Sequence, residues 1–334
     1  MTSKVGAIVI KVALLVLLSW NALGTAVAGE PNQVKVGIYV TQLYDFDMSK
    51  RSFNISFWTW FLYPDETYKP LETIEIVNAK TSQLKFTSTV TKEDVLWGAV
   101  KKKIWWAQGK YSALISEDWN VTNFPFDRQV LYLDIEDGQS DTSQVVFVAD
   151  VENSRIDAAV TIPGWTVENF KIKSVDSVYN TTYGDPLLTG TSTYSKIIAQ
   201  IVVKRDGWRL LCNMFIGFFV AFSLVSLTYF MDAETMGGSR IGLCAGAIFA
   251  ATGNKYIIDG YLPHSSIFTL ADSIEVSTFM TILFSILIVI IVMLVKPKRP
   301  RLAMWLNYLG AKISIIGYVV WNSYAIYTVA TSHG

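Results

Sequence analysis

The sequence has few of the residues that build redox, metal or catalytic centres. Its 334 residues include two cysteines, Cys212 and Cys244, and two histidines, His264 and His333. Two cysteines that lie in apolar stretches exclude the disulfide framework of a small exported domain, and they do not suggest a metal site. Two histidines cannot form a histidine-rich catalytic centre, and no nucleophile constellation is visible. The sequence therefore does not predict an enzyme, and no cofactor is expected.

An excess of charge of either sign is absent as well. The 28 basic and 28 acidic side chains give a formal charge of zero, so no feature points to nucleic acid as a partner. Apolar residues are abundant at 51% of the chain, and aromatic residues make up 13%. The apolar residues are concentrated at the start of the chain and after residue 205. This split predicts a soluble module joined to a membrane module.

Residues 1–28 have the pattern of a secretory signal peptide. Lys4 provides a basic start, residues 9–20 form a mostly apolar core, and Ala26-Val27-Ala28 is a small-residue cleavage site. A first membrane helix is the less favoured interpretation, because the apolar run is too short to cross a bilayer. The mature chain is expected to begin at Gly29, outside the cytoplasm.

Residues 29–205 have the pattern of a β domain. Short runs of β-branched and aromatic residues alternate with turn residues at intervals typical of a β-sandwich. The expected strands cover residues 35–43, 52–62, 74–77, 84–90, 111–115, 129–135, 144–148, 165–172 and 194–203. No helix of note is predicted before Trp208. We expect an immunoglobulin-like β-sandwich.

Residues 206–334 contain apolar segments that are long enough to cross a lipid bilayer. The predicted transmembrane helices cover about residues 208–231, 239–261, 272–295 and 302–330. The link Lys296-Pro-Lys-Arg-Pro-Arg301 is basic and falls inside the cell if the amino terminus is outside, in agreement with the positive-inside tendency. The sequence thus predicts an α+β membrane protein of the cell or inner membrane. Its β-sandwich would be extracellular or periplasmic, and a four-helix transmembrane bundle would follow.

The second of these segments is unusual for a helix that faces lipid. At about 100° per residue, glycines and two aromatic residues fall in one stripe, while Arg240 and Asn254 point nearly the other way. This glycine stripe comprises Gly238, Gly242, Gly246, Phe249, Gly253, Tyr256 and Gly260. One interpretation is a packing face, since glycine lets helices approach closely. The other is a pore wall around a ring axis, with Phe249 as an apolar constriction.

The motif Phe124-Pro-Phe-Asp-Arg-Gln129 resembles the signature loop of the pentameric ligand-gated ion channels, the Cys-loop receptor superfamily. Val36-Gly-Ile-Tyr-Val, Arg240-Ile-Gly-Leu and Leu262-Pro263 match further segments of that family in order and spacing. Eukaryotic members carry two cysteines around the loop, where this chain has Glu117 and Leu131. The chain is therefore similar to the prokaryotic type that lacks this disulfide. Its first membrane segment also lacks the proline typical of the family.

The resemblance implies a homopentameric, agonist-gated channel for inorganic ions in a lipid bilayer. The glycine stripe would then line the pore, and a ring of Phe249 side chains would block ions by dewetting. Asp232, Glu234 and Asp259 near the ends of this helix favour cations. Lys255 and Asp259 are expected to pair on its flank. The rival interpretation is a non-conducting membrane receptor or adhesion protein of the same architecture.

The resemblance also implies a ligand site between subunits. Its candidate residues are Trp58, Glu75, Glu136, Asp137, Tyr179, Tyr183 and Tyr194, and the contribution of Trp105 and Trp106 stays open. Aromatic faces and carboxylates suit a small primary amine through cation–π contacts and ion pairs. A Ca²⁺ ion held by Glu136 and Asp137 is an alternative. A further alternative is that these are solvated loop acids and surface tyrosines.

A last group of residues is expected to couple the two domains. It consists of Asp47, Asp127, Arg205 and Pro263, with Asp45 as an alternative to Asp47. The resemblance places the loop of Asp127 on top of the membrane helices, and Arg205 lies three residues before Trp208. One arginine can hold two carboxylates at such a junction. The competing interpretation is that Arg205 anchors the helix end at the lipid headgroups.

Overall fold

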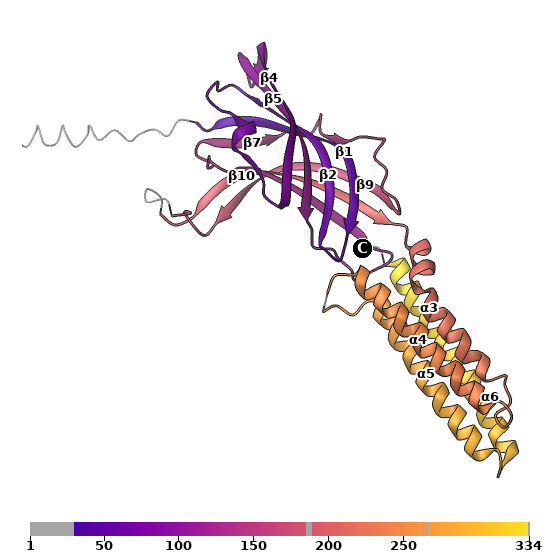
Figure 1. Cartoon of the computed structure of the whole chain (residues 1–334). Helices are drawn as coiled ribbons and strands as arrows, with labels where there is room; N and C mark the ends of the chain where they lie inside the picture. Colours follow the sequence, from indigo (N-terminus) through magenta and orange to yellow (C-terminus); the bar gives the residue numbers. More distant parts are fainter. Residues whose placement is uncertain (1–29, 185–188, 265, 333–334) are drawn as a thin grey trace, which may run out of the picture.

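The computed structural model describes residues 30–184, 189–264 and 266–332. The predicted signal peptide, residues 1–28, lies outside the described residues. The chain forms a β domain followed by four long helices, which extend away from it as one elongated group (Figure 1).

Each alternating run of the sequence overlaps a strand of the β domain, but several strands extend well beyond the predicted ranges. The strands are β1 (Asn32–Asp47), β2 (Ser52–Tyr63), β3 (Ile74–Ile76), β4 (Ala79–Trp97), β5 (Val100–Ser116), β6 (Arg128–Asp137), β7 (Val145–Ala149), β8 (Arg155–Ile156), β9 (Trp165–Tyr179) and β10 (Ser192–Arg205). Two short elements were not predicted, β8 and the helix α2 (Pro70–Thr73). The helix begins with proline, whose fixed φ suits a first helical position.

The strands form two sheets. One sheet has the order β4-β5-β2-β1-β7, with β8 paired to β1, and the other has the order β3-β6-β10-β9. Most neighbours are antiparallel, whereas β7 and β8 run parallel to β1. The second sheet joins β6, β9 and β10 side by side, and these strands carry the candidate residues Glu136, Asp137, Tyr179, Tyr194 and Arg205.

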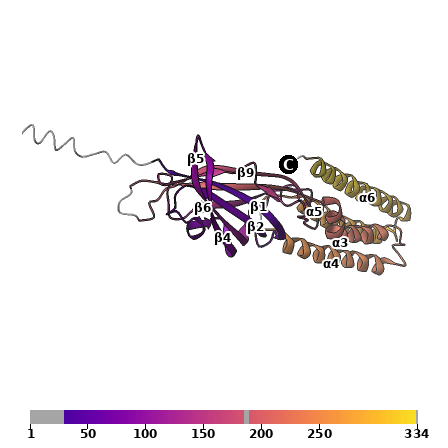
Figure 2. The ribbon, with the colours of Figure 1, turned by 90° about the horizontal axis from the view of Figure 1, so that it is seen from above.

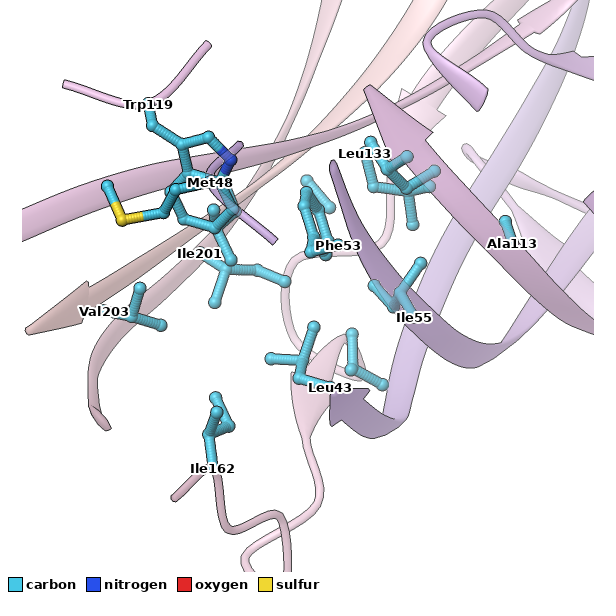
Figure 3. Close-up of a cluster of buried hydrophobic side chains, with 14 of the residues drawn as sticks. Leu43, Met48, Phe53, Ile55, Ala113, Trp119, Leu133, Ile162, Ile201 and Val203 are labelled. Atoms are coloured by element: carbon cyan, nitrogen blue, oxygen red, sulfur yellow. The ribbon is translucent and has the colours of Figure 1, made fainter. Parts of the chain in front are cut away.

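Side chains from both sheets share one hydrophobic core (Figure 3). Phe53 and Ile55 of β2, Leu133 of β6 and Ile201 of β10 are fully buried in it. Burial of a large apolar side chain contributes about 1.5–3 kcal/mol. The same cluster continues into the helices through residues such as Phe215, so the β domain and the helices are packed against each other.

The four helices are each long and apolar enough to cross a membrane, and the chain is a multi-pass membrane protein. They are α3 (Gly207–Thr228), α4 (Gly237–Tyr261), α5 (Leu270–Val295) and α6 (Pro300–Thr331). Helix α3 ends three residues before the predicted boundary at residue 231, and a turn held by Asp232 follows. Helix α5 starts earlier than predicted because Thr269 and Asp272 form a capping box.

Helices α4 and α6 lie on opposite sides of the group, with α3 and α5 between them (Figure 2). Helix α4 packs mainly against α3 and α5, while α6 packs mainly against α5. This arrangement leaves one long face of α4 and one of α6 uncovered by the other described residues.

Candidate functional site

Every member of the glycine stripe of α4 is exposed on the single chain. Phe249 exposes 79% of its surface and Tyr256 exposes 72%. A Cβ atom added at Gly238, Gly242, Gly246, Gly253 or Gly260 would meet no described atom within 4 Å. The stripe therefore does not serve as a packing face toward the other helices of the same chain.

Polar contacts hold the opposite face of α4 against its neighbours. Buried Asn254 accepts a hydrogen bond of 3.0 Å from the backbone N–H of Gly217 on α3. A Cβ atom at Gly217 would lie 2.5 Å from Asn254 Oδ1, so this approach requires glycine. Near the start of α4, buried Arg240 donates to Asn307 Oδ1 of α6 at 2.7 Å. The helical wheel predicted this orientation of Arg240 and Asn254 correctly.

Lys255 forms an ion-pair network on the flank of α4. Its Nζ lies 3.4 Å from Asp259 Oδ2, as the spacing predicted, and 2.8 Å from Glu275 Oε1 on α5. Sequence reasoning missed Glu275, because a partner on another helix has no fixed spacing along the chain. The pairing directs Lys255 toward α5 rather than along the glycine stripe.

The acidic residues before α4 form ion pairs with a lysine at the end of α5. Lys296, which follows α5, forms an ion pair with Asp232, and its Nζ lies 3.7 Å from Glu234 Oε2. The Lys296 contact, together with backbone N–H groups of the turn, lowers the pKa of the Asp232 carboxyl well below its usual value. The negative charge at this end of α4 is thus partly compensated within the chain.

Three tyrosines gather where β9 and β10 pair. The ring centroids of Tyr179, Tyr183 and Tyr194 lie 5.8 to 6.2 Å apart, in tilted or edge-to-face contacts. The Tyr179 hydroxyl donates a hydrogen bond of 3.0 Å to Glu136 Oε2 on β6. The structure therefore brings the predicted tyrosines and Glu136 together, and we call this group, with Lys196, the tyrosine–carboxylate site.

Lys196 of β10 already occupies part of this site. It lies opposite Glu136 in the β6–β10 register, and its Nζ is 3.5 Å from Glu136 Oε2 and 4.0 Å from Asp134 Oδ2. The same ammonium lies 5.8 Å from the centroid of the Tyr179 ring. Burial raises the pKa of Glu136 despite the opposing effects of Tyr179 and Lys196. Sequence reasoning missed Lys196, since the register between strands is not visible in the sequence.

Glu75 and Asp137 differ in how they relate to this site. Glu75 is exposed and lies opposite Glu136 in the β3–β6 register. Asp137 is 1% exposed and accepts hydrogen bonds from Tyr68, Thr73 and the backbone of the turn at 139–140.

Glu136 and Asp137 therefore do not form a shared Ca²⁺ site. Successive strand residues point to opposite faces, so the two carboxylates diverge. The described residues contain no group of three or more potential metal ligands. Asp137 instead stabilises the turn after β6.

Trp58 lies on the other sheet, on β2. Phe86 contacts its ring edge-on at 5.5 Å, and Lys110 Nζ lies 5.6 Å from its centroid. Trp105 and Trp106 of β5 are each covered in the same way by a lysine, Lys103 at 5.1 Å and Lys92 at 5.3 Å. The described part of a single chain does not bring Trp58 into contact with the tyrosine–carboxylate site.

Arg205 is the centre of the junction between the β domain and the helices. Its Nε lies 2.7 Å from Asp127 Oδ1, and its Nη2 lies 3.3 Å from Asp127 Oδ2. Its Nη1 donates to the Tyr261 hydroxyl at 3.0 Å, and its guanidinium lies 3.9 Å from the Trp165 ring centroid. Met48 of the turn between β1 and β2 also contacts it. We call these residues the Arg205 junction.

The predicted coupling group is thus only partly assembled. Asp47 pairs with Ser49 and Lys50 inside its own turn, and its neighbour Met48 reaches Arg205 instead. The prediction that Arg205 holds both Asp47 and Asp127 is wrong in this respect. Pro263 lies just beyond α4, beside a hollow formed with Val121 and the start of α5. Tyr261 and Trp165 were missed, since aromatic contacts across such sequence distances leave no local signal.

Glu117 closes the base of the loop that carries Asp127. Its Oε2 accepts a hydrogen bond of 3.1 Å from the backbone N–H of Tyr132. Burial raises the pKa of the Glu117 carboxyl to about 7, and Asp118 and Asp134 contribute in the same direction. The loop is therefore closed by a carboxylate–amide contact that titrates near neutral pH.

Scanned against protein-family models the chain matches none, and a search of the curated proteins returns no match either.

Proposed function

We propose that this protein is an agonist-gated, cation-conducting ion channel formed by a homopentamer around α4. The observation that carries the proposal is the exposed glycine stripe of α4. This face of a membrane-spanning helix consists of bare glycine backbone and two aromatic rings, so it offers lipid few apolar side chains. Around a ring axis, the same face provides a wide, water-accessible wall with one apolar constriction at Phe249.

The back face of α4 supports this assignment. Arg240 and Asn254 are buried against α6 and α3, so the polar contacts of the helix are directed away from the stripe. A ring of five chains could use the remaining flank, where Lys255 is held by Asp259 and Glu275, as a boundary between neighbours. Acidic residues at the two ends of α4 favour cations, although Lys296 reduces the charge of Asp232 and Glu234.

The β domain is proposed to be an extracellular or periplasmic immunoglobulin-like sandwich that binds the agonist. Two sheets with a shared core support the sandwich. The basic segment between α5 and α6 supports an orientation with that link inside the cell. The tyrosine–carboxylate site supports a small primary amine as agonist, because it combines three aromatic rings with Glu136, and the exposed Glu75 lies opposite Glu136 on the neighbouring strand.

The Arg205 junction provides a physical path from that site to α4. Strand β10 carries Lys196 near one end and Arg205 at the other, and Arg205 binds Tyr261 in the last turn of α4. A displacement of β10 on ligand binding would therefore be transmitted to the end of the pore helix. The signature loop takes part through Asp127.

Single-channel recording from purified protein in planar bilayers tests the proposal. We expect discrete cation currents that increase with a primary amine, and a pentameric mass in the detergent-solubilised protein. Phe249→Ala should change those currents, which links them to this chain rather than to a contaminant. A pentamer that binds an amine but never conducts, with or without Phe249, would instead support a non-conducting receptor of the same architecture.

A further inference from the structure

Met48 is the one methionine among residues 30–205, and it lies in the turn between β1 and β2. Its Sδ atom lies 2.7 Å from Nη2 of Arg205. A thioether sulfur is a weak hydrogen-bond acceptor, so it is a modest partner for a guanidinium N–H. The remaining methionines are Met1 and residues of the helices or of their connections after residue 205. Met48 is therefore the methionine whose chemistry can act directly on the Arg205 junction.

The Nη2 atom of Arg205 contacts two acceptors. Besides the sulfur of Met48, it lies 3.3 Å from Asp127 Oδ2. The shorter contact to this carboxylate, 2.7 Å, is made by Nε to Oδ1, and Nη1 donates to the Tyr261 hydroxyl. A stronger acceptor at position 48 would compete with Asp127 Oδ2 for Nη2, while the contacts of Nε and Nη1 do not involve that nitrogen.

A hollow at the surface reaches Met48. Its walls come from the β1–β2 turn and from the end of α4, including Lys50, Gly260 and Tyr261, and its volume is about 620 Å³. A water molecule occupies about 30 Å³ in the liquid, so hydrogen peroxide, which is little larger, has ample room there. The Met48 side chain as a whole is only 2% exposed. The hollow therefore provides the route by which a small oxidant reaches it.

The sulfur lies at the margin of the hydrophobic core. Figure 3 shows Met48 beside Trp119, with its sulfur pointing away from Phe53. The compartment expected for this domain is extracellular or periplasmic, and such compartments are oxidising. Methionine is oxidised to the sulfoxide, a polar group, and methionine sulfoxide reductases reverse the change.

We propose that Met48 is a site of reversible oxidation by hydrogen peroxide, and that its oxidation loosens the Arg205 junction. A lone pair of the sulfur attacks one peroxide oxygen, the O–O bond breaks and an S–O bond forms. The second oxygen leaves with its own hydrogen and takes the hydrogen of the first oxygen, which gives water. The sulfur is oxidised by two electrons and the peroxide is reduced by two, so no further reactant is needed.

The sulfoxide changes the junction in two ways. Its oxygen is a stronger acceptor than the thioether sulfur, so it draws Nη2 of Arg205 away from Asp127 Oδ2. The added polar oxygen must also fit at a side chain that belongs to the hydrophobic core, and sulfoxides disrupt such cores. Both effects lower the stability of the folded protein. The proposal rests on this geometry and on the exported location of the domain, and not on ion conduction.

The test treats the purified full-length protein in detergent with hydrogen peroxide. Peptide mapping by mass spectrometry measures the sulfoxide at each methionine, and thermal melting measures the consequence. We expect Met48 to be oxidised at least about fivefold faster than Met214 of α3, which is similarly buried at 9% exposure. Oxidation should lower the melting temperature by about 3 °C or more, and a methionine sulfoxide reductase should restore it.

Three variants assign the effect to position 48. Met48→Leu has a side chain of similar volume but no sulfur, so its melting temperature should not respond to peroxide. Met48→Gln places a carbonyl oxygen near Arg205 and should melt like the oxidised parent protein, with or without peroxide. Met304→Leu is the control, because Met304 is 71% exposed on α6 and touches no part of the junction. It should respond to peroxide as the parent protein does.

Three outcomes would overturn the proposal. One is that Met48 stays unmodified while the exposed Met304 is fully oxidised. Another is that Met48 is oxidised but the melting temperature of the parent protein does not change. The third is an equal effect of peroxide on Met48→Leu and on the parent protein, which would assign the effect to other methionines. If Met48→Leu does not fold, the peptide maps of the parent protein and of Met304→Leu, together with the reversal by the reductase, decide the question.

Discussion

Arg205 and Asp127 form a two-point ion pair that is almost completely removed from solvent. The two contacts measure 2.7 and 3.3 Å, and the side chains are only 3% and 1% exposed. Arg205 ends β10, while Asp127 belongs to the loop before β6. Because Arg205 also binds Tyr261 of α4, one guanidinium joins two parts of the β domain to the proposed pore helix.

Loss of one partner of this pair should destabilise the protein strongly. Arg205→Gln leaves the Asp127 carboxylate buried without its cation, and breaking such a pair costs about 3–5 kcal/mol. Tyr261→Phe removes only the hydroxyl that accepts a hydrogen bond from Arg205. It should lower the free energy of unfolding by at most about 3 kcal/mol, the upper end of the range for hydrogen bonds to charged groups. Chemical denaturation of the solubilised protein measures both, and we expect agonist-evoked currents to fall in both variants.

Asp47→Asn provides the control for these variants. Asp47 lies next to Met48 but pairs with Ser49 and Lys50, so this change should leave unfolding and currents close to those of the parent protein. Suppose that Asp47→Asn and Arg205→Gln assemble equally well and lose agonist-evoked current to the same extent. That result would contradict the conclusion that Asp127, and not Asp47, is the carboxylate partner of Arg205.

The sequence predicts element positions well because they depend on local patterns. Apolar length defines the four helices, and the alternation of residues such as Phe53 and Ile55 defines the strands. The orientation of α4 was also predictable, since the helical period places Phe249 opposite Asn254 and Arg240. The period of a strand likewise places Glu136 and Asp137 on opposite faces, so the shared Ca²⁺ site could have been rejected from the sequence.

Contacts between elements were not predictable in the same way. Lys196 meets Glu136 through the register of β6 and β10, and a shift by one residue would move it to the other face. Glu275 reaches Lys255 only through the packing of α4 on α5. Trp165 and Tyr261 meet Arg205 from segments that are far apart in the sequence. Asp127 and Arg205 were found because a recognisable motif contains Asp127.

Phe249→Ala should increase the resting conductance severalfold. Phe249 is the large apolar residue among the glycines in the middle of the stripe, and its removal widens and wets the proposed constriction. Recording without agonist in planar bilayers measures the effect. Ile257→Ala is the control, because Ile257 is exposed on α4 but lies off the stripe. Equal resting currents in the parent protein and Phe249→Ala, with unchanged agonist sensitivity, would reject Phe249 as the gate.

Glu117 should make stability depend on pH around neutrality. Its folded-state pKa of about 7 lies above its ordinary value of 4.5, so the folded protein binds the proton more tightly than the unfolded chain. The stability that this proton provides is fully present below about pH 4.5 and is lost as pH rises through about 7. Glu117→Gln stays neutral and keeps an acceptor for the Tyr132 N–H.

The measurement is the melting temperature of both proteins from pH 5 to pH 8. We expect the Glu117→Gln variant to gain stability relative to the parent protein as pH rises from 5 to about 7, and the difference to level off above about pH 7. Glu136 also has a raised pKa, but it is present in both proteins and cancels in the difference. A difference that is constant over this pH range would show that Glu117 does not titrate there.

Glu136 and Lys196 should have opposite effects on the binding of an amine. The Lys196 ammonium lies 3.5 Å from Glu136 Oε2, so an incoming ammonium competes with it for the same carboxylate. Glu136→Gln removes the charge and should weaken the binding of a small primary alkylamine about tenfold, which corresponds to about 1.4 kcal/mol. Lys196→Met removes the competitor, keeps a side chain of similar length, and should tighten binding severalfold. Isothermal titration calorimetry measures binding directly, so the result does not depend on whether the protein conducts.

The control variant is Lys204→Met, which changes an exposed lysine near the far end of the same strand and should leave the affinity for the amine unchanged. Weaker amine binding in Lys196→Met would mean that the lysine organises the site rather than competing for it, and unchanged binding in Glu136→Gln would place the amine elsewhere.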